Sequence, residues 1–154
     1  MKNIHQQVIA MRRHWPGFET AGETRDEVTW IGSLAGIERE YRLLVEYGLP
    51  VAGKPLSMFR RFPVVRIMSP SLKPRLGTSD SPLPHVYFDD GDITLSPLCL
   101  FDPRENQWSA DKLIALTTIP WAADWLACYE GWLATGEWFG GGRHAALEQE
   151  ERIQ

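Results

Sequence analysis

Cys99 is the residue whose type and setting best suit covalent chemistry. It stands between Leu98 and Leu100, in an irregular segment just before a predicted helix. A thiol with a pKa near ~8.5 is already partly ionised at neutral pH, and a thiolate can accept an acyl group and later lose it to an amine. A small buried side chain without a chemical role fits the same position, so the residues alone leave both interpretations open.

Further candidates for chemistry lie on both sides of this cysteine. His85 is a candidate base or oxyanion donor, although a turn held by its hydrogen bonds explains it as well. Asp102 and Asp111 are candidates for orienting an attacking amine, but a turn and a helix start explain them without a function. Cys128 is predicted to lie among tryptophan rings on a helix, where an inert packed thiol is expected.

The composition restricts the broad class of protein. The 154 residues are 44% hydrophobic with a formal net charge of -4, which predicts one domain over residues 1–154. The two cysteines have no pairing pattern and no neighbouring ligand cluster, so we expect neither a disulfide, a metal nor a cofactor. A negative chain is not expected to bind nucleic acid, and no apolar run approaches membrane-spanning length, so we expect a soluble, cytoplasmic protein. The local cations are expected to be solvated: Arg60, Arg61, Arg66, Lys73 and Arg75.

The first half of the chain predicts one helix and three strands. The helix is predicted by apolar residues at helical spacing, namely Ile4, Val8, Met11 and Trp15. Pro16-Gly17 is expected to end it. Residues 18–27 are polar and show no period. Runs of β-branched and aromatic residues predict strands joined as an antiparallel meander: Val28 to Leu34, Glu40 to Tyr47 and Pro63 to Met68. Four prolines between Ser69 and Pro84 predict an exposed loop.

Two helices are predicted in the second half. Ser109 is a good cap for a short helix with the apolar stripe Leu113, Ile114 and Leu116. A longer helix has Pro120 in its first turn and Gly136 at its left-handed end. One face of that helix carries Cys128 among aromatic rings and the opposite side carries Glu130; the rings are Trp121, Trp125, Tyr129 and Trp132. The predicted fold class is therefore α+β, with an amino-terminal helix, an antiparallel β-meander, the cysteine segment and carboxy-terminal helices.

This order, together with several short strings, resembles the ubiquitin-conjugating enzyme (UBC) fold family. In that family a His-Pro-Asn turn precedes an apolar-Cys-Leu segment, and a tryptophan opens the next helix; the matching residues are His85, Leu98-Cys99-Leu100 and Trp108-Ser109. The chain is most similar to the stand-alone conjugating-enzyme-like proteins of short type II CBASS anti-phage operons. The similar strings are Pro84 to Tyr87, Leu98 to Leu100, Ile119 to Trp121, Trp125 to Glu130, Trp132 to Gly136 and Gly140 to His144.

The resemblance implies acyl transfer through a thioester on Cys99. The expected donor is the carboxy terminus of a cGAS-like (CD-NTase) nucleotidyltransferase, the expected acceptor is an amine of a target protein, and an activating enzyme is a further candidate partner. Two alternatives remain open. A catalytically silent UBC-fold protein would only bind the nucleotidyltransferase, and a cysteine hydrolase would need the cysteine, a histidine and an orienting acid in one cleft.

One departure from the family pattern concerns the oxyanion. Val86 and Tyr87 stand where the family has proline and asparagine, so the amide side chain that would stabilise the oxyanion is absent. A backbone N–H, the Tyr87 hydroxyl or the His85 imidazole is expected to replace it, with Asp102 as a candidate for supporting the site. The acidic insert from Asp89 to Asp92 is expected to be a solvated turn. His144, after three glycines, is a candidate for binding a partner or the substrate tail, or has no role.

Overall fold

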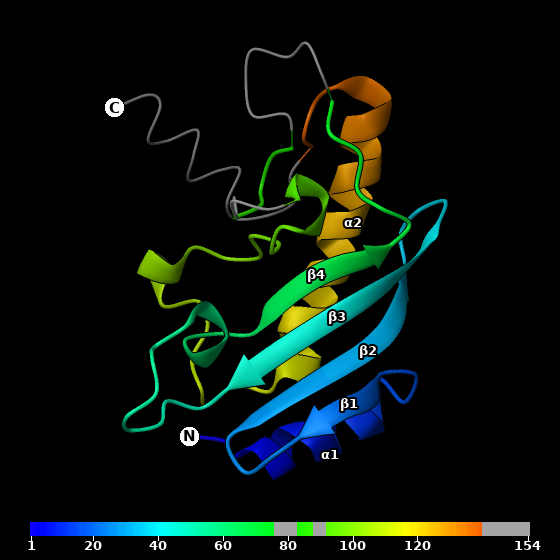
Figure 1. Cartoon of the computed structure of the whole chain (residues 1–154). Coiled ribbons are helices and arrows are strands. Elements are labelled where there is room, and N and C mark those ends of the chain that lie inside the picture. Colours follow the sequence, from blue (N-terminus) through cyan, green and yellow to red (C-terminus); the bar gives the residue numbers. More distant parts are fainter. Residues whose placement is uncertain (76–82, 88–91, 140–154) are drawn as a thin grey trace.

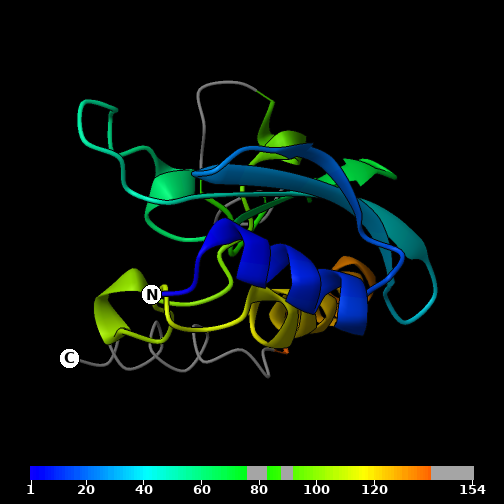
Figure 2. The same ribbon diagram turned by 90° about the horizontal axis from the view of Figure 1, so that it is seen from below.

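Two α-helices lie on the same side of a four-stranded antiparallel sheet (Figure 1, Figure 2). The structure is a computed structural model that describes residues 1–75, 83–87 and 92–139. In chain order the elements are α1 (Ile4–His14), β1 (Glu19–Glu23), β2 (Glu27–Ala35), β3 (Glu40–Gly48), β4 (Val64–Ser69) and α2 (Thr118–Thr135). The described residues between them also form four single-turn 3-10 helices: Met58–Arg60, Ile93–Leu95, Pro103–Glu105 and Ile114–Leu116. The predicted α+β fold with an antiparallel meander is confirmed.

Helix α1 begins at a capping box and ends where it was predicted to end. Asn3 accepts from the Gln6 N–H at 2.8 Å, and the Gln6 side chain accepts from the Asn3 N–H at 2.9 Å, which satisfies two donors of the first turn. Met11 is fully buried, and Trp15 caps the last turn. The Trp15 indole then donates to the Ala115 carbonyl at 2.7 Å, which fixes α1 to the segment before α2.

The sheet contains one strand that the sequence pattern did not predict. Strand β1 pairs with β2, with Thr20 opposite Trp30, but all five residues of β1 are exposed. An edge strand of this kind buries no side chain, so its sequence has no alternation of apolar and polar residues. The other three strands were predicted. The inner strands β2 and β3 alternate between buried and more exposed residues, and their buried faces supply core residues such as Trp30 and Val45.

The prediction of a short helix after Ser109 is wrong. The chain forms a tight turn in which the Lys112 N–H donates to the Ser109 carbonyl at 3.0 Å, followed by the 3-10 turn Ile114–Leu116. The physical reason is the buried side chain of Gln7 on α1. It donates to the Lys112 carbonyl at 2.9 Å and accepts from the Ile114 N–H at 3.0 Å, so it takes the backbone groups that a continuous helix would pair internally.

Helix α2 buries its aromatic face and ends at Gly136, whose φ of 83° is in the left-handed region favoured by glycine. Glu130, expected to point away from the rings, is engaged with the β2–β3 turn. Its carboxylate accepts from the N–H groups of Ile37, Glu38 and Arg39 and from the Tyr41 hydroxyl, at distances between 2.5 and 3.1 Å. This carboxylate therefore joins α2 to the end of the sheet.

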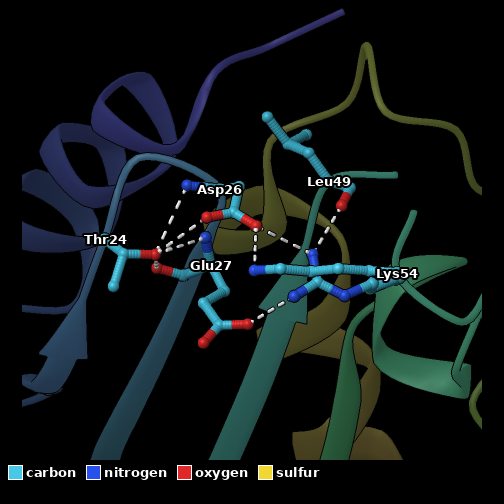
Figure 3. Close-up of polar contacts among 6 residues, drawn as sticks. Thr24, Asp26, Glu27, Leu49 and Lys54 are labelled. Atoms are coloured by element: carbon cyan, nitrogen blue, oxygen red, sulfur yellow. Dashed lines mark hydrogen bonds and ion pairs between the residues drawn. The ribbon is translucent and has the colours of Figure 1, made fainter. Parts of the chain in front are cut away.

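Arg60 is buried in an ion-pair cluster, so its expected solvation is wrong (Figure 3). Its side chain donates to Asp26 at 3.1 Å, to Glu27 at 2.6 Å and to the Leu49 carbonyl at 2.8 Å, and Arg60 is only 6% exposed. Lys54 also donates to Asp26 at 3.1 Å, and this bond is the main reason that the pKa of Asp26 is lowered. The cluster fastens the connection between β3 and β4 to the turn between β1 and β2.

Two more of the local cations have partners in the fold. Arg66 on β4 pairs with Glu46 on β3. Arg75 donates to the Trp132 carbonyl at 3.1 Å, near the carboxy-terminal end of α2.

Helix α2 is the longest helix in the described part of the chain. No helix in that part is long and apolar enough to cross a membrane.

Candidate functional site

Cys99 lies on a short antiparallel pairing that is attached to the sheet. The Cys99 N–H donates to the His85 carbonyl at 2.9 Å, and the Tyr87 N–H donates to the Pro97 carbonyl at 2.8 Å. Between these two bonds, Val86 and Leu98 form a β-bridge. The backbone from Pro97 to Cys99 is therefore held against the His85 turn, although it belongs to no long strand.

Strand β4 and the core complete this support. The Leu98 N–H donates to the Val65 carbonyl of β4 at 2.9 Å, and the Leu98 side chain is buried. The thiol of Cys99 is half-buried, with Sγ 3.7 Å from the Phe101 carbonyl oxygen. The segment is irregular, as expected from the sequence, and these bonds support its backbone.

His85 uses its backbone to hold the turn beside the cysteine. Its φ of 55° places it in the left-handed region, and its carbonyl accepts from both the Cys99 N–H and the Trp125 indole, each at 2.9 Å. The imidazole ring lies against the Trp138 ring, with centroids 4.6 Å apart. The bonds that hold this turn are thus made by the backbone carbonyl of His85, and the roles expected for its side chain stay predictions.

Tyr87 places a hydroxyl close to the thiol. The hydroxyl oxygen is buried and has no hydrogen-bond partner at bonding geometry among the described residues. Burial raises the pKa of Tyr87 far above its ordinary value, and the neighbouring Cys99 thiol and Asp102 carboxylate raise it further. The hydroxyl is therefore protonated at neutral pH and keeps a proton to donate.

Asp102 caps a turn next to the site. It is buried, and its carboxylate accepts from the Arg104 N–H at 2.9 Å, which starts the 3-10 turn Pro103–Glu105. The Arg104 guanidinium adds bonds to both carboxylate oxygens at 2.9 to 3.2 Å. These contacts explain Asp102 structurally, while its charge acts on the Tyr87 hydroxyl across the site.

A groove of about 670 Å³ lies beside these residues. Its wall includes Tyr87 and Phe101, together with Trp108 and residues of the connection before β4 such as Leu56, Met58 and Phe62. The Trp108 indole N–H is buried and has no acceptor within the described parts of the chain. The sequence analysis missed this groove, because its residues share no spacing pattern.

The predicted site residues divide into those that meet and those that do not. Cys99, His85, Tyr87 and Asp102 come together. Asp111 lies elsewhere, 76% exposed in its side chain, and pairs with the amino terminus at 2.6 Å, which lowers its pKa. His144 and the insert residues 89–91 lie outside the described residues.

Two tryptophans and the second cysteine complete the description of the site. Trp125 and Trp138 both contact His85. Trp125 was expected only as part of the aromatic face of the long helix, and an aromatic stripe gives no signal for a contact of this kind. Cys128 is half-buried, with Sγ 3.7 Å from the Phe139 carbonyl, and is less enclosed than its predicted place among the rings implies. Across residues 1–75, 83–87 and 92–139, no group of three potential His, Cys, Asp or Glu ligands is placed to hold a metal ion.

The comparison with known families is informative about this chain. The family model for E2-CBASS, described as the type II CBASS E2 protein, matches residues 7–145. This range runs from the first helix past the end of α2 and includes the paired segments that carry His85 and Cys99. A comparison with curated proteins found no match.

Proposed function

The chain belongs to the type II CBASS E2 family, which takes part in CBASS anti-phage defence, and on that premise we propose that Cys99 is an acyl carrier. The acyl group is the carboxy-terminal carboxylate of a cGAS-like nucleotidyltransferase, held as a thioester and passed to an amine of a target protein. One observation carries this proposal: a half-buried cysteine stands on a backbone held by the N–H groups of Leu98 and of Cys99 itself, with a protonated hydroxyl beside it.

The proposed reaction has two steps, acylation of Cys99 and transfer of the acyl group to an amine. The donor arrives as an activated acyl group, an acyl adenylate or a thioester, and the Cys99 thiolate forms a bond to its carbonyl carbon while AMP or the donor thiol leaves. In the second step an amine attacks the same carbon. The carbon–sulfur bond then breaks, the thiolate of Cys99 is regenerated, and the amine loses a proton to solvent or to a base.

Each step passes through a tetrahedral oxyanion that needs a hydrogen-bond donor. We propose the Tyr87 hydroxyl for this role, because it is protonated and buried close to the thiol to which the acyl group is attached. The Cys99 N–H is less suitable, since it already donates to the His85 carbonyl. The family's asparagine would then be replaced by a residue of the same turn.

Intact-mass analysis with and without reductant tests the nucleophile. The chain is incubated with a thioester of the nucleotidyltransferase's carboxy-terminal peptide, which supplies the activated carboxylate. We expect a reductant-labile adduct, lost in Cys99→Ala and converted to a more persistent oxyester in Cys99→Ser. Cys128→Ala is the matched control, because both thiols are half-buried and lie 3.7 Å from a carbonyl oxygen.

The results also separate the alternatives. An adduct mapped to Cys128, or one that persists in Cys99→Ala, would overturn the assignment. Binding without any adduct would indicate a silent binding module, and release of the free acid without transfer would indicate a hydrolase. Tyr87→Phe should slow adduct formation by roughly 10²-fold if its hydroxyl stabilises the oxyanion, and an unchanged rate would exclude that role.

A further inference from the structure

The chain after α2 turns back along the helix and reaches the turn that holds Cys99 (Figure 1). Gly136, with a φ of 83°, ends the helix, and the Thr135 hydroxyl accepts from the Glu137 N–H at 3.1 Å. A Cβ atom at Gly136 would lie 2.9 Å from the Arg75 guanidinium, which itself donates to a carbonyl in the last turns of the helix. The direction in which the chain leaves α2 is therefore fixed.

Trp138 is the residue of this segment that meets the cysteine site. The centroid of its ring lies 4.6 Å from that of the His85 ring and 5.3 Å from that of the Trp125 ring, the latter in an edge-to-face contact. Aromatic rings at these separations attract one another beyond the burial of their surface. Trp138 is half-buried, whereas the next residue, Phe139, is 64% exposed. The segment thus contributes one ring that contacts both α2 and the His85 turn.

The His85 turn depends on support of this kind because its backbone is strained. Its φ of 55° lies in the left-handed region, which an L-residue with a side chain adopts only at a cost in free energy. From this conformation the His85 carbonyl accepts from the Cys99 N–H and from the Trp125 indole, each at 2.9 Å. If His85 relaxed to a negative φ, this carbonyl would turn away and the backbone of the proposed nucleophile would be released.

We propose that Trp138 is a positioning residue for acyl transfer, whose ring holds the His85 turn in the conformation that fixes the backbone of Cys99. This role rests on the proposed function and adds a residue that acts on the rate without touching the reacting atoms. The ring contacts the imidazole and also the ring of Trp125, whose indole N–H donates to the same carbonyl. Misplacing a reacting group by about 1 Å can lower a rate by roughly 10²-fold, so a modest loosening of the turn is enough to slow acylation.

Acylation kinetics of substituted full-length proteins test this role. Each protein is mixed with increasing concentrations of a thioester of the nucleotidyltransferase's carboxy-terminal peptide, and the reductant-labile adduct is followed by intact mass. Trp138→Leu keeps an apolar side chain without the ring, and should lower the rate at saturating peptide by roughly tenfold with an unchanged half-saturating concentration. Trp138→Phe keeps a ring and should stay within about threefold of the wild-type rate. Phe139→Leu is the matched control at the exposed neighbour, and should leave the rate unchanged.

A double substitution shows whether Trp138 acts through His85. His85→Gly allows the left-handed conformation without strain and removes the imidazole that Trp138 contacts. In the His85→Gly background, Trp138→Leu should therefore change the rate by less than about twofold, because residues that act through one another are not additive. An equal loss of rate in both backgrounds would show that Trp138 acts independently of His85, and would overturn the proposal.

Amide hydrogen exchange reports on the turn in the absence of any substrate. The Cys99 N–H donates to the His85 carbonyl, and the amides of β3, which is paired on both sides, serve as the internal reference. In ¹⁵N-labelled Trp138→Leu protein, we expect the exchange of the Cys99 amide to accelerate roughly tenfold relative to the amides of β3. Equal acceleration at both places would mean that Trp138 only stabilises the fold as a whole, and would overturn the positioning role.

The outcomes separate this role from the function on which it rests. Selective loss of Cys99 amide protection in Trp138→Leu, with no reductant-labile adduct in the wild-type chain, would support the positioning role and contradict the acyl carrier. An adduct that forms at the same rate in the wild-type chain and in Trp138→Leu would leave the acyl carrier intact and overturn the positioning role. A raised half-saturating concentration at an unchanged maximal rate would show that Trp138 binds the donor instead, and would also overturn it.

Discussion

Replacing His85 by glycine and by alanine separates its backbone role from its side-chain role. Both substitutions remove the imidazole and its contact with Trp138, which is worth about 0.5–1.5 kcal/mol for aromatic pairs. They differ in the backbone, because φ is 55° at this position. Alanine keeps a left-handed conformation that costs an L-residue about 1–2 kcal/mol, whereas glycine adopts it without that cost.

The expected difference between the two variants is small but has a definite sign. Glycine loses about 0.5–1 kcal/mol relative to alanine through its greater freedom in the unfolded chain, so the net advantage of His85→Gly over His85→Ala is about 0–1.5 kcal/mol, with a midpoint near 0.75 kcal/mol. Urea denaturation of the two variants measures it. His5 on the exposed face of α1 is the matched control, where helix propensity favours alanine over glycine by about 1 kcal/mol.

The same pair of variants addresses acyl transfer. The His85 carbonyl bonds to Cys99 and Trp125 in either variant, so His85→Gly should still form the thioester if the carbonyl is what the site requires. An alanine variant as stable as the glycine variant would refute the strain argument. Loss of the thioester in both variants, with both folded, would show that the imidazole takes part.

Three further predictions concern stability. Trp125→Ala should lower the free energy of unfolding by about 3–5 kcal/mol, because the ring is 4% exposed and stacks on Tyr129; an unchanged melting temperature would contradict its burial. Glu130→Gln should cost about 1–2 kcal/mol more in urea denaturation than Asp124→Asn, an exposed carboxylate on the same helix, and equal costs would mean that the bonds to the β2–β3 turn contribute nothing. All four tyrosines have a raised pKa, about 12 for Tyr47, so their contribution to stability is complete below the unfolded pKa of ~10 and lost as the pH rises through the folded values. Tyrosinate absorbance should therefore appear together with unfolding, and a gradual rise near pH ~10 in folded protein would contradict it.

Elements with a buried face could be predicted from the sequence, and those without one could not. Helix α1 and strands β2 and β3 each bury one side, so their apolar residues recur at the period of the element, and β4 is marked by a continuous apolar, β-branched run. Strand β1 exists because its backbone pairs with β2, and that pairing leaves no mark on the side chains. The turn after Ser109 depends on a glutamine more than 100 positions earlier, which no local pattern contains.

The burial of charged residues is also difficult to predict from local sequence patterns. Arg60 looked like a surface cation, but Asp26, which lies 34 positions before it, makes its burial tolerable. Glu130 looked like a solvent-facing position, yet it bonds to N–H groups 91 to 93 positions away. Whether a charge is buried depends on partners that the fold brings together, whereas the hydrophobic period depends only on the element itself.

The candidate site lies between these two cases. Cys99, His85 and Tyr87 could be identified from the sequence because the turn and the cysteine segment are recognisable strings that pair with each other. The protonation of Tyr87 could not, because it follows from burial and from the closeness of the thiol and Asp102. A tyrosine in water would also be protonated at neutral pH, but water would occupy its hydroxyl. Enclosure is what leaves the hydroxyl with a proton and no competing partner, the two conditions that an oxyanion donor must meet before the substrate arrives.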